Sequence, residues 1–329
     1  MPRPARSWGR SLPVTSLPPE LRANRPPGHV AVTIGVFDGV HRGHQYLLRT
    51  LRDHAAARGL TPVVVTFANH PLTVLRPDVQ LILITPLDER LTLIREQGIA
   101  HVVPITFTRD VSLLLAEEFV GALARDLGMR HLVVGPDFAL GYQRKGTVQR
   151  LAEIGRGAGF TVEAVPLLTV DGLKPKSTTI RNALAVGDLP TVERCLGRRF
   201  AVRGVVVRGE ARGAGLGFPT ANLGIERTQA LPADGIYAAW ATVDGARHAA
   251  AVSVGAKPTF HEHGERVLEA HLLDFAGNLY GKDIRLEFVR RLRGQERFDT
   301  IDALIAQIHR DVDETRMALA TPRLKSQAW

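Results

Sequence analysis

Two hydrophobic patterns alternate along residues 30–165 of this 329-residue chain. Short continuous apolar runs, typical of strands buried on both faces, are separated by stretches in which apolar residues recur every three or four positions. The runs predict strands at 30–34, 61–67, 101–105, 131–135 and 160–165. The periodic stretches predict helices at 45–58, 86–98, 116–127 and 147–156. This order predicts an α/β domain with a doubly wound parallel sheet covered by helices on both faces.

The pattern changes after residue 181, where a helical stretch at 182–196 predicts a connector. Alternating runs separated by turn residues then predict strands at 200–207, 236–243, 248–254, 267–275 and 283–289. No further helical periodicity occurs until about residue 300, where an amphipathic stripe begins: Ile301, Leu304, Ile305, Ile308 and Val312. We therefore expect a second domain, an antiparallel β-barrel closed by a C-terminal helix.

These patterns divide the chain into four parts. Residues 1–28, which are rich in proline and arginine, are expected to form an irregular basic arm. The α/β domain is expected at 29–186, the connector at 187–199 and the barrel domain at 200–322.

The net charge of +9 raises the question of nucleic-acid binding. Much of this charge lies near the two ends, with five arginines and one glutamate in residues 1–29 and a further Arg and Lys in residues 321–329. No basic stripe with interleaved aromatic residues occurs between them. Nucleic-acid binding is therefore a weak alternative, and small molecules are the partners that we expect.

The chain has one cysteine, Cys195, so no intrachain disulfide can form. It has no apolar run of about 18 residues and no apolar segment typical of a secretory signal. These features predict a cytoplasmic protein without a membrane span, in which Cys195 is packed and inert.

The strongest candidate chemistry lies between the first strand and the following helix, in the segment Gly-Val-Phe-Asp-Gly-Val-His-Arg-Gly-His at 35–44. Unpaired N–H groups at a helix N-terminus favour anions such as phosphate. His41 and His44 are three positions apart and can face one polyphosphate, while the glycines permit a tight turn. The alternative is that Gly and His only punctuate a turn.

This segment resembles the motif of the HxGH nucleotidyltransferases, and it is most similar to the adenylyltransferase half of prokaryotic bifunctional riboflavin kinase/FMN adenylyltransferases. The resemblance implies that the FMN phosphate attacks the α-phosphorus of ATP and that pyrophosphate leaves. His41 and His44 would be catalytic, stabilising charge on the phosphates. The ATP-binding residues implied for this segment are Gly35, Phe37, Asp38, Gly39, His41 and His44.

A second phosphate-binding candidate is Ser-Thr-Thr-Ile-Arg at 177–181. By itself it predicts a helix cap with a surface arginine. The resemblance matches Ser177, Thr178 and Arg181 to the S-T-x-x-R segment of the family, which contacts ATP phosphates. Lys176 departs from the family pattern, which often has a serine there.

Two further segments match parts of the family that line the FMN pocket. The FMN-binding residues that the resemblance implies are Asn69, His70, Pro71, Asp137 and Phe138. Phe67 is added to them, because its ring and that of Phe138 could pack on the flavin. From the residues alone, Phe67 and Phe138 are equally consistent with ordinary core. Leu140 stands where the family often has a second phenylalanine, so one ring is missing.

The barrel domain contains a glycine-rich segment at 208–217 followed by Phe-Pro-Thr-Ala-Asn at 218–222. The glycines alone predict a hairpin loop, since the spacing is not that of a Walker A motif. The second part resembles the P-T-A-N signature of riboflavin kinases, in which Thr and Asn hold Mg²⁺ and ATP phosphates. The residues implied to bind ATP are Gly209, Arg212, Gly213, Gly217, Pro219, Thr220 and Asn222, with Thr220 and Asn222 at the metal. Ala214 replaces a second arginine that is common in the family.

Glu269 lies within an otherwise apolar predicted strand. It either faces solvent or faces a site, because an unpaired buried carboxylate is costly. The resemblance implies that it is the general base, removing the proton from the ribityl 5′-hydroxyl of riboflavin. His261 and His263 offer two ligands without a third and are interpreted as solvated surface.

The resemblance extends over residues 28–320 and implies a bifunctional enzyme that uses ATP and Mg²⁺ to convert riboflavin to FMN and FMN to FAD. Two alternatives remain. One is an enzyme in which only one domain is active. The other is a flavin- or RNA-binding protein without catalytic activity, which only the high pI suggests.

Overall fold

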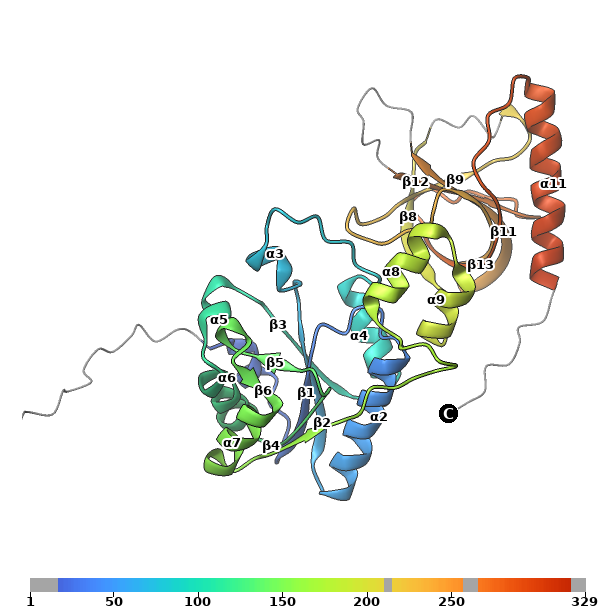
Figure 1. Ribbon diagram of the computed structural model, residues 1–329. Coiled ribbons are helices and arrows are strands. Elements are labelled where there is room, and N and C mark those ends of the chain that lie inside the picture. Colours follow the sequence, from blue (N-terminus) through green and yellow to red (C-terminus); the bar gives the residue numbers. More distant parts are fainter. Residues whose placement is uncertain (1–16, 210–214, 257–265, 321–329) are drawn as a thin grey trace, which may run out of the picture. The chain divides into compact units, whose positions relative to one another are not determined.

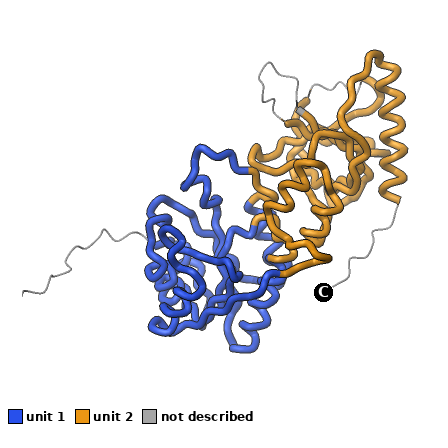
Figure 2. The backbone as a smooth tube through the Cα atoms, in the orientation of Figure 1, with its two compact units in different colours: residues 1–37, 44–81, 87–167 blue, residues 38–43, 82–86, 168–329 orange. Residues whose placement is uncertain are grey.

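The computed structural model describes residues 17–209, 215–256 and 266–320. The chain separates into two compact units, which Figure 2 shows in different colours. Unit 1 comprises residues 1–37, 44–81 and 87–167, and unit 2 comprises residues 38–43, 82–86 and 168–329. Two short segments that precede residue 167 therefore pack with the second half of the chain.

Unit 1 contains a parallel sheet with the strand order β3-β2-β1-β4-β7. The strands are β1 (Val30–Ile34), β2 (Thr61–Phe67), β3 (His101–Ile105), β4 (Met129–Val134) and β7 (Thr161–Ala164). This confirms the predicted parallel α/β fold. The chain order reverses between β1 and β4, which is where open α/β sheets bind ligands beyond the carboxyl ends of the strands.

Helices cover both faces of this sheet (Figure 1). On one side lie α2 (Arg42–Ala57) and α4 (Leu87–Arg95), and on the other lie α5 (Arg109–Leu113), α6 (Ala116–Ala122), the π-helix Leu123–Leu127 and α7 (Val148–Ala158). Successive strand residues point to opposite faces, and Ala31 and Val32 are both fully buried. Burial on both faces explains why the strands read as continuous apolar runs.

Shorter elements complete unit 1. They are α1 (Pro19–Ala23), α3 (Leu72–Leu75), the two-stranded β5 (Ala139–Leu140) and β6 (Gly146–Thr147), and the 3₁₀ helix Tyr142–Arg144. The arm at 1–28 was expected to be irregular, but α1 is helical because Leu21 is fully buried in the same hydrophobic core as the sheet. Tertiary packing here overrides a proline-rich composition.

The predicted connector helix is two helices, α8 (Ser177–Val186) and α9 (Leu189–Leu196). Gly187, with φ of +75°, ends α8 in the left-handed conformation that glycine favours. The Asp188 side chain then accepts a hydrogen bond from the Thr191 N–H at 3.1 Å and caps α9. Cys195 is buried, as expected, and burial raises the pKa of its thiol.

The second half of the chain forms a closed barrel with the strand order β10-β11-β12-β9-β8-β13. Its strands are β8 (Ala201–Val207), β9 (Ala221–Gly224), β10 (Gly235–Val243), β11 (Ala246–Ala256), β12 (Arg266–Leu272) and β13 (Asp283–Arg293). All pairings are antiparallel, which confirms the predicted β-barrel. Sequence reasoning missed β9, which is short but pairs with both β8 and β12 and is needed to close the barrel.

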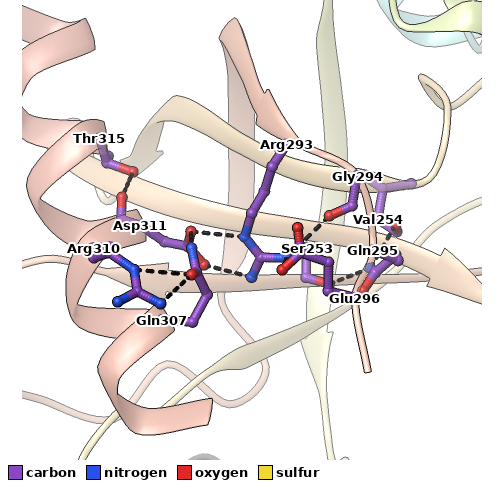
Figure 3. Close-up of polar contacts among 10 residues, drawn as sticks. All are labelled: Ser253, Val254, Arg293, Gly294, Gln295, Glu296, Gln307, Arg310, Asp311 and Thr315. Carbon is purple, nitrogen blue, oxygen red and sulfur yellow. Dashed lines mark hydrogen bonds and ion pairs between the residues drawn. The ribbon is translucent and has the colours of Figure 1, made fainter. Parts of the chain in front are cut away.

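The C-terminal helix α11 (Ile301–Ala320) packs on the barrel, as predicted. Figure 3 shows the polar network beneath it. The Arg293 guanidinium donates two hydrogen bonds to the Asp311 carboxylate, at 2.9 and 2.8 Å, and Gln307 donates to the same carboxylate at 2.9 Å. Ile301, expected on the inward stripe, is 65% exposed because the apolar contact begins further along the helix.

Candidate active sites

The segment at 35–44 forms a turn whose backbone is strained. Phe37 and Val40 have φ angles of 55° and 39°, in the left-handed region that non-glycine residues disfavour. Phe37 and Val40 are both buried, which holds them in this conformation. Glycine at residue 35 leaves room for the Phe37 ring, since a Cβ there would lie 3.2 Å from it and would have to displace it slightly.

Asp38 organises this turn from a buried position. Its carboxylate accepts hydrogen bonds from the Ile84 N–H at 2.9 Å and the Thr85 N–H at 3.1 Å. It also forms an ion pair with Arg181 at 2.5 Å, and the Arg181 Nε donates to the Ile82 carbonyl at 2.7 Å. Two predicted ATP-binding residues, Asp38 and Arg181, therefore bind each other, and the charge of Arg181 is largely balanced within the protein.

The N-terminus of α8 lies against the same turn. The Ser177 hydroxyl donates to the Asp38 carbonyl at 3.0 Å. Lys176, not Ser177, occupies the N-cap position, and its side chain makes no capping hydrogen bond. Ser177 and Thr178 are thus the first residues of the helix. They bring the N–H groups of its first turn close to the motif, where an anion would be favoured.

Arg198 is a residue of this site that sequence reasoning missed. Its guanidinium donates to the carbonyl oxygens of Gly39 at 2.8 Å and Val40 at 3.3 Å. His41 is 7% exposed, and burial together with the charge of Arg198 lowers its pKa to about 3. His41 is therefore neutral near pH 7. It packs against Gly43, where a Cβ would lie 3.1 Å from the imidazole ring.

His44 lies in the first turn of α2, where its ring meets the Phe37 ring edge-on with centroids 5.1 Å apart. Together with the preceding loop, this places the predicted phosphate-binding segment at the carboxyl end of β1. A strained turn leading into a helix N-terminus is suited to anion binding.

A cavity of about 750 Å³ opens at the same edge of the sheet. Its lining begins at Ile34 and Gly35 and includes most of the predicted FMN-binding residues: Phe67, His70, Pro71, Asp137 and Phe138. Further lining residues that the sequence did not single out are Phe107, Arg109, Leu140, Tyr142 and Arg144. Its size lies within the range of cofactor and ligand pockets, and the aromatic side chains suit a flat ring system.

Asn69 does not line this cavity but holds part of its wall. Its side-chain carbonyl accepts from the Phe107 N–H at 2.8 Å, and its amide donates to the Phe107 carbonyl at 2.9 Å. The Phe107 ring in turn meets the Phe67 ring edge-on, with centroids 5.5 Å apart. Asn69 is therefore a positioning residue for the aromatic wall.

In the barrel, the predicted kinase residues meet across neighbouring strands. Asn222 of β9 is directly opposite Glu269 of β12, and Glu269 is opposite Ser253 of β11. Directly opposed residues share one face of a sheet. Because Leu268 and Ala270 are fully buried in the barrel core, Glu269 faces the other way, toward the outside of the barrel.

Gly209 and Asn222 are in close contact. A Cβ at residue 209 would lie only 2.1 Å from the Asn222 amide nitrogen, so any other residue there would displace the Asn222 side chain. Asn222 is 9% exposed, and Thr220 is half-buried two residues earlier. Gly217 has φ of +86°, which glycine adopts without strain.

Pro219, another predicted ATP-binding residue, contacts β12 through its backbone. Its carbonyl oxygen lies 2.8 Å from His271 Nδ1. Arg212 and Gly213, with the neighbouring Ala214, lie outside the described residues, as do His261 and His263.

Comparisons with known proteins agree with this division into two sites. The family described as FAD synthetase matches residues 24–179, and the family described as riboflavin kinase matches residues 196–319. A bifunctional riboflavin kinase/FMN adenylyltransferase from Pseudomonas fluorescens is 39% identical over 88% of this chain and 93% of its own length. The Bacillus subtilis protein of the same description is 35% identical over 86% of this chain and 90% of its own.

A similar solved structure is the crystal structure described as a macrolide-efflux protein from Streptococcus pneumoniae. It is 31% identical, covers 90% of this chain and 96% of its own, and superposes with a TM-score of 0.82. The description as an efflux protein applies to that structure and is not transferred to this chain. Across the described part of the present chain, no helix combines the length and apolar character that crossing a bilayer requires.

The fold and the two matched regions define a two-domain transferase that joins a nucleotidyltransferase-type α/β domain to a flavokinase barrel. The chain belongs to the bifunctional riboflavin kinase/FMN adenylyltransferase family. Family membership confirms the resemblance that was inferred from the motif at 35–44 and the P-T-A-N signature at 219–222.

Proposed function

We propose that the barrel domain phosphorylates riboflavin to FMN and that the α/β domain adenylylates FMN to FAD, each with ATP. Membership of the family across both halves of the chain supports both activities. The observation that carries the residue assignment is that the phosphate-binding turn and the cavity share Gly35, so a nucleotide phosphate and a flavin can meet there.

In the adenylyl transfer, a phosphate oxygen of FMN attacks the α-phosphorus of ATP and pyrophosphate leaves. His44 and the N–H groups at the start of α2 stabilise the phosphate charge. His41 contributes as a neutral hydrogen-bond donor, since its low pKa keeps it uncharged. Ser177 and Thr178 add the N-terminus of α8, and the Asp38–Arg181 ion pair holds the turn in shape.

The flavin ring of FMN occupies the cavity, with Phe67 and Phe138 in its wall. Arg109 and Arg144 are the cations on the lining, and they are placed to balance the charge of the FMN phosphate. Leu140 lines the same cavity, so the phenylalanine missing from the family pattern would have stood in this wall.

In the kinase reaction, Glu269 removes the proton from the ribityl 5′-hydroxyl of riboflavin, whose oxygen attacks the γ-phosphorus of a second ATP. The hydroxyl of Thr220 and the amide oxygen of Asn222 are hard oxygen donors of the kind that Mg²⁺ prefers. The contact of Asn222 with Gly209 and its pairing with Glu269 keep this donor beside the base. Bound Mg²⁺ would neutralise charge on the ATP phosphates.

We place this chemistry in the cytoplasm, where a single buried cysteine is stable in its reduced form. Flavin and nucleotide substrates, with Mg²⁺, are the ligands that the proposal requires.

One assay tests the division of labour. The full chain is incubated with riboflavin, ATP and Mg²⁺, and the flavins are separated by chromatography; both FMN and FAD should form. The His44→Ala variant should stop at FMN. The Glu269→Gln variant should make no FMN but should still adenylylate added FMN. Loss of both activities in either variant, with the fold intact by circular dichroism, would contradict the assignment.

A further inference from the structure

A cluster of two imidazoles and a carboxylate lies in unit 1, outside both sites described above. His54 comes from the last turn of α2, His131 from β4 and Glu163 from β7. Their nearest ligand atoms all lie within 4.8 Å of one another. The three residues come from distant parts of the sequence and are brought together by the fold of unit 1.

The distances within this cluster fit a single small cation. Glu163 Oε2 lies 2.8 Å from His54 Nδ1 and 3.4 Å from His131 Nε2. Two ligand atoms bound to Zn²⁺ at about 2.0–2.1 Å and near the tetrahedral angle are roughly 3.3 Å apart. A zinc ion therefore fits among the three atoms with only small side-chain shifts.

His131 provides the strongest sign that something is bound here. Its side chain is 3% exposed, and within the described chain its Nε2 has no hydrogen-bond partner of acceptable geometry. Its other nitrogen, Nδ1, is 2.7 Å from the Thr161 hydroxyl, which itself contacts the Arg130 carbonyl at 3.5 Å. With Nδ1–H donated to Thr161, the lone pair of Nε2 points at a carboxylate oxygen.

A lone pair facing a carboxylate is repulsive unless a proton or a cation lies between them. Donation of the Thr161 hydroxyl proton to the Arg130 carbonyl favours the tautomer of His131 with its proton on Nδ1, which leaves the Nε2 lone pair for a cation. The contact between His131 and Thr161 has the form of the outer hydrogen bond that usually orients a metal-bound histidine. Arg58 reaches the same Glu163 oxygen only at 3.9 Å, at the margin of an ion pair.

We propose that His54, His131 and Glu163 bind one Zn²⁺ ion, each through a single ligand atom, with water in the fourth position. The site is open to solvent on one side, since the side chains of His54 and Glu163 are 29% and 38% exposed. His54 is ten residues along α2 from His44, about 15 Å away, so this ion is separate from the adenylyl-transfer chemistry. It joins the end of α2 to the edge strand β7 through β4.

The test uses the full chain, freed of metal with a chelator and titrated without ATP. Zn²⁺ should bind at one ion per chain by calorimetry, and Co²⁺ should give the visible absorption of a tetrahedral site. The Glu163→Gln and His54→Ala variants should each bind Zn²⁺ at least about tenfold more weakly. The His101→Ala variant is the matched control, because it removes an exposed histidine of β3 in the same sheet and should bind normally.

A second measurement separates ligand loss from misfolding. A hundredfold excess of Zn²⁺ over its Kd should raise the Tm of unit 1 by about 5–10 °C in the wild type but not in the Glu163→Gln variant. The Thr161→Val variant, which keeps all three ligands, should weaken binding about 10- to 100-fold. Both variants should still convert riboflavin to FMN. Absence of stoichiometric Zn²⁺ binding by the wild type, or equal binding by all variants, would overturn the proposal.

Discussion

Single residues fix the shape of the turn at 35–44, the candidate phosphate-binding segment. Phe37 and Val40 hold left-handed backbone angles that their side chains disfavour, and the cost is offset by burial and by hydrogen bonds from neighbouring segments. Arg198 ties down the Gly39 and Val40 carbonyls, and the Asp38 carboxylate is held by Ile84 and Thr85. The proposed binding of phosphate would therefore cost this turn little conformational freedom.

Burial of His41 predicts a distinctive pH dependence of stability. Its pKa is about 3 in the folded chain against 6.5 in the unfolded chain, so the unfolded state binds the extra proton as pH falls below 6.5. The stabilisation is complete above that pH and is lost between pH 6.5 and 3. From pH 7 to pH 5 the loss should be about 2 kcal/mol.

Urea unfolding of the wild type and of His41→Gln at both pH values measures this loss. The variant should show a smaller decrease in stability than the wild type. An equal decrease in the two proteins would mean that folding does not lower the pKa of His41, so that the buried imidazole takes up a proton as readily as it does in the unfolded chain.

The contact of Gly209 with Asn222 predicts a selective defect. A methyl group at residue 209 would displace the Asn222 amide, because the two would be 2.1 Å apart. The Gly209→Ala variant should lose most riboflavin kinase activity and keep adenylylation of added FMN. Gly215→Ala is the control, since a Cβ there meets no atom of the described residues within 4 Å. Steady-state rates of FMN and FAD formation decide the point, and normal kinase activity in Gly209→Ala would count against the proposed role of Asn222.

Sequence reasoning named candidate site residues but not their partners. His44, Asp38 and Arg181 were named because they belong to local motifs. The ion pair between Asp38 and Arg181 spans 143 positions, and Arg198 contacts Gly39 from 159 positions away. No local pattern carries such pairings, because only the folded chain brings the residues together.

At the level of elements, the predictions succeeded where the hydrophobic period is strong. The strands at 61–67 and 101–105 were predicted with their observed bounds. The strand β9 was missed because Ala221–Gly224 is short and contains Asn and Gly, which disfavour strands. Its stability comes from pairing on both sides with β8 and β12, which is a tertiary effect.

The ion pair beneath α11 gives a test of how that helix is held. The side chains of Arg293 and Asp311 are only 17% and 7% exposed, and Asp311 also receives a hydrogen bond from Gln307 (Figure 3). Removal of one partner leaves a buried charge uncompensated. The Asp311→Ala variant should therefore lose about 3 kcal/mol of unfolding free energy.

The exposed pair of Arg316 and Asp274 provides the comparison. Arg316→Ala should cost less than about 1 kcal/mol, because water screens this pair. Chemical denaturation followed by circular dichroism measures both variants. Equal losses would show that burial of the Arg293–Asp311 pair is not what holds the helix.

At the level of the whole molecule, the residues that the structure describes form two hydrophobic cores, one within each unit. Ile84 belongs by sequence to the first half, yet it is fully buried in the core that contains the barrel residues, and its side chain packs against Gly39 of the motif turn. The Leu83 N–H and carbonyl also pair with Thr228 and Ala230. The motif turn therefore contacts, at Gly39, a residue of the core that contains the barrel.

This arrangement predicts that one core substitution affects both activities. Ile84→Ala should cost about 2–5 kcal/mol, increase hydrogen exchange in the barrel strands and reduce adenylyl transfer by loosening the turn at Gly39. Ile94→Ala, which empties a fully buried position in unit 1, should leave exchange in the barrel unchanged. Unaltered adenylyl transfer in a folded Ile84→Ala variant would show that the turn is held independently of this core.

The hydrogen bonds of Arg198 also limit how the two activities can be separated. The region that matches FAD synthetase ends at residue 179, and a natural place to cut the gene would fall soon after it. A fragment ending there would strip the Gly39 and Val40 carbonyls of their guanidinium donor, although every motif residue before the cut would be present. An autonomous adenylyltransferase obtained by truncation would need to retain the chain at least as far as Arg198.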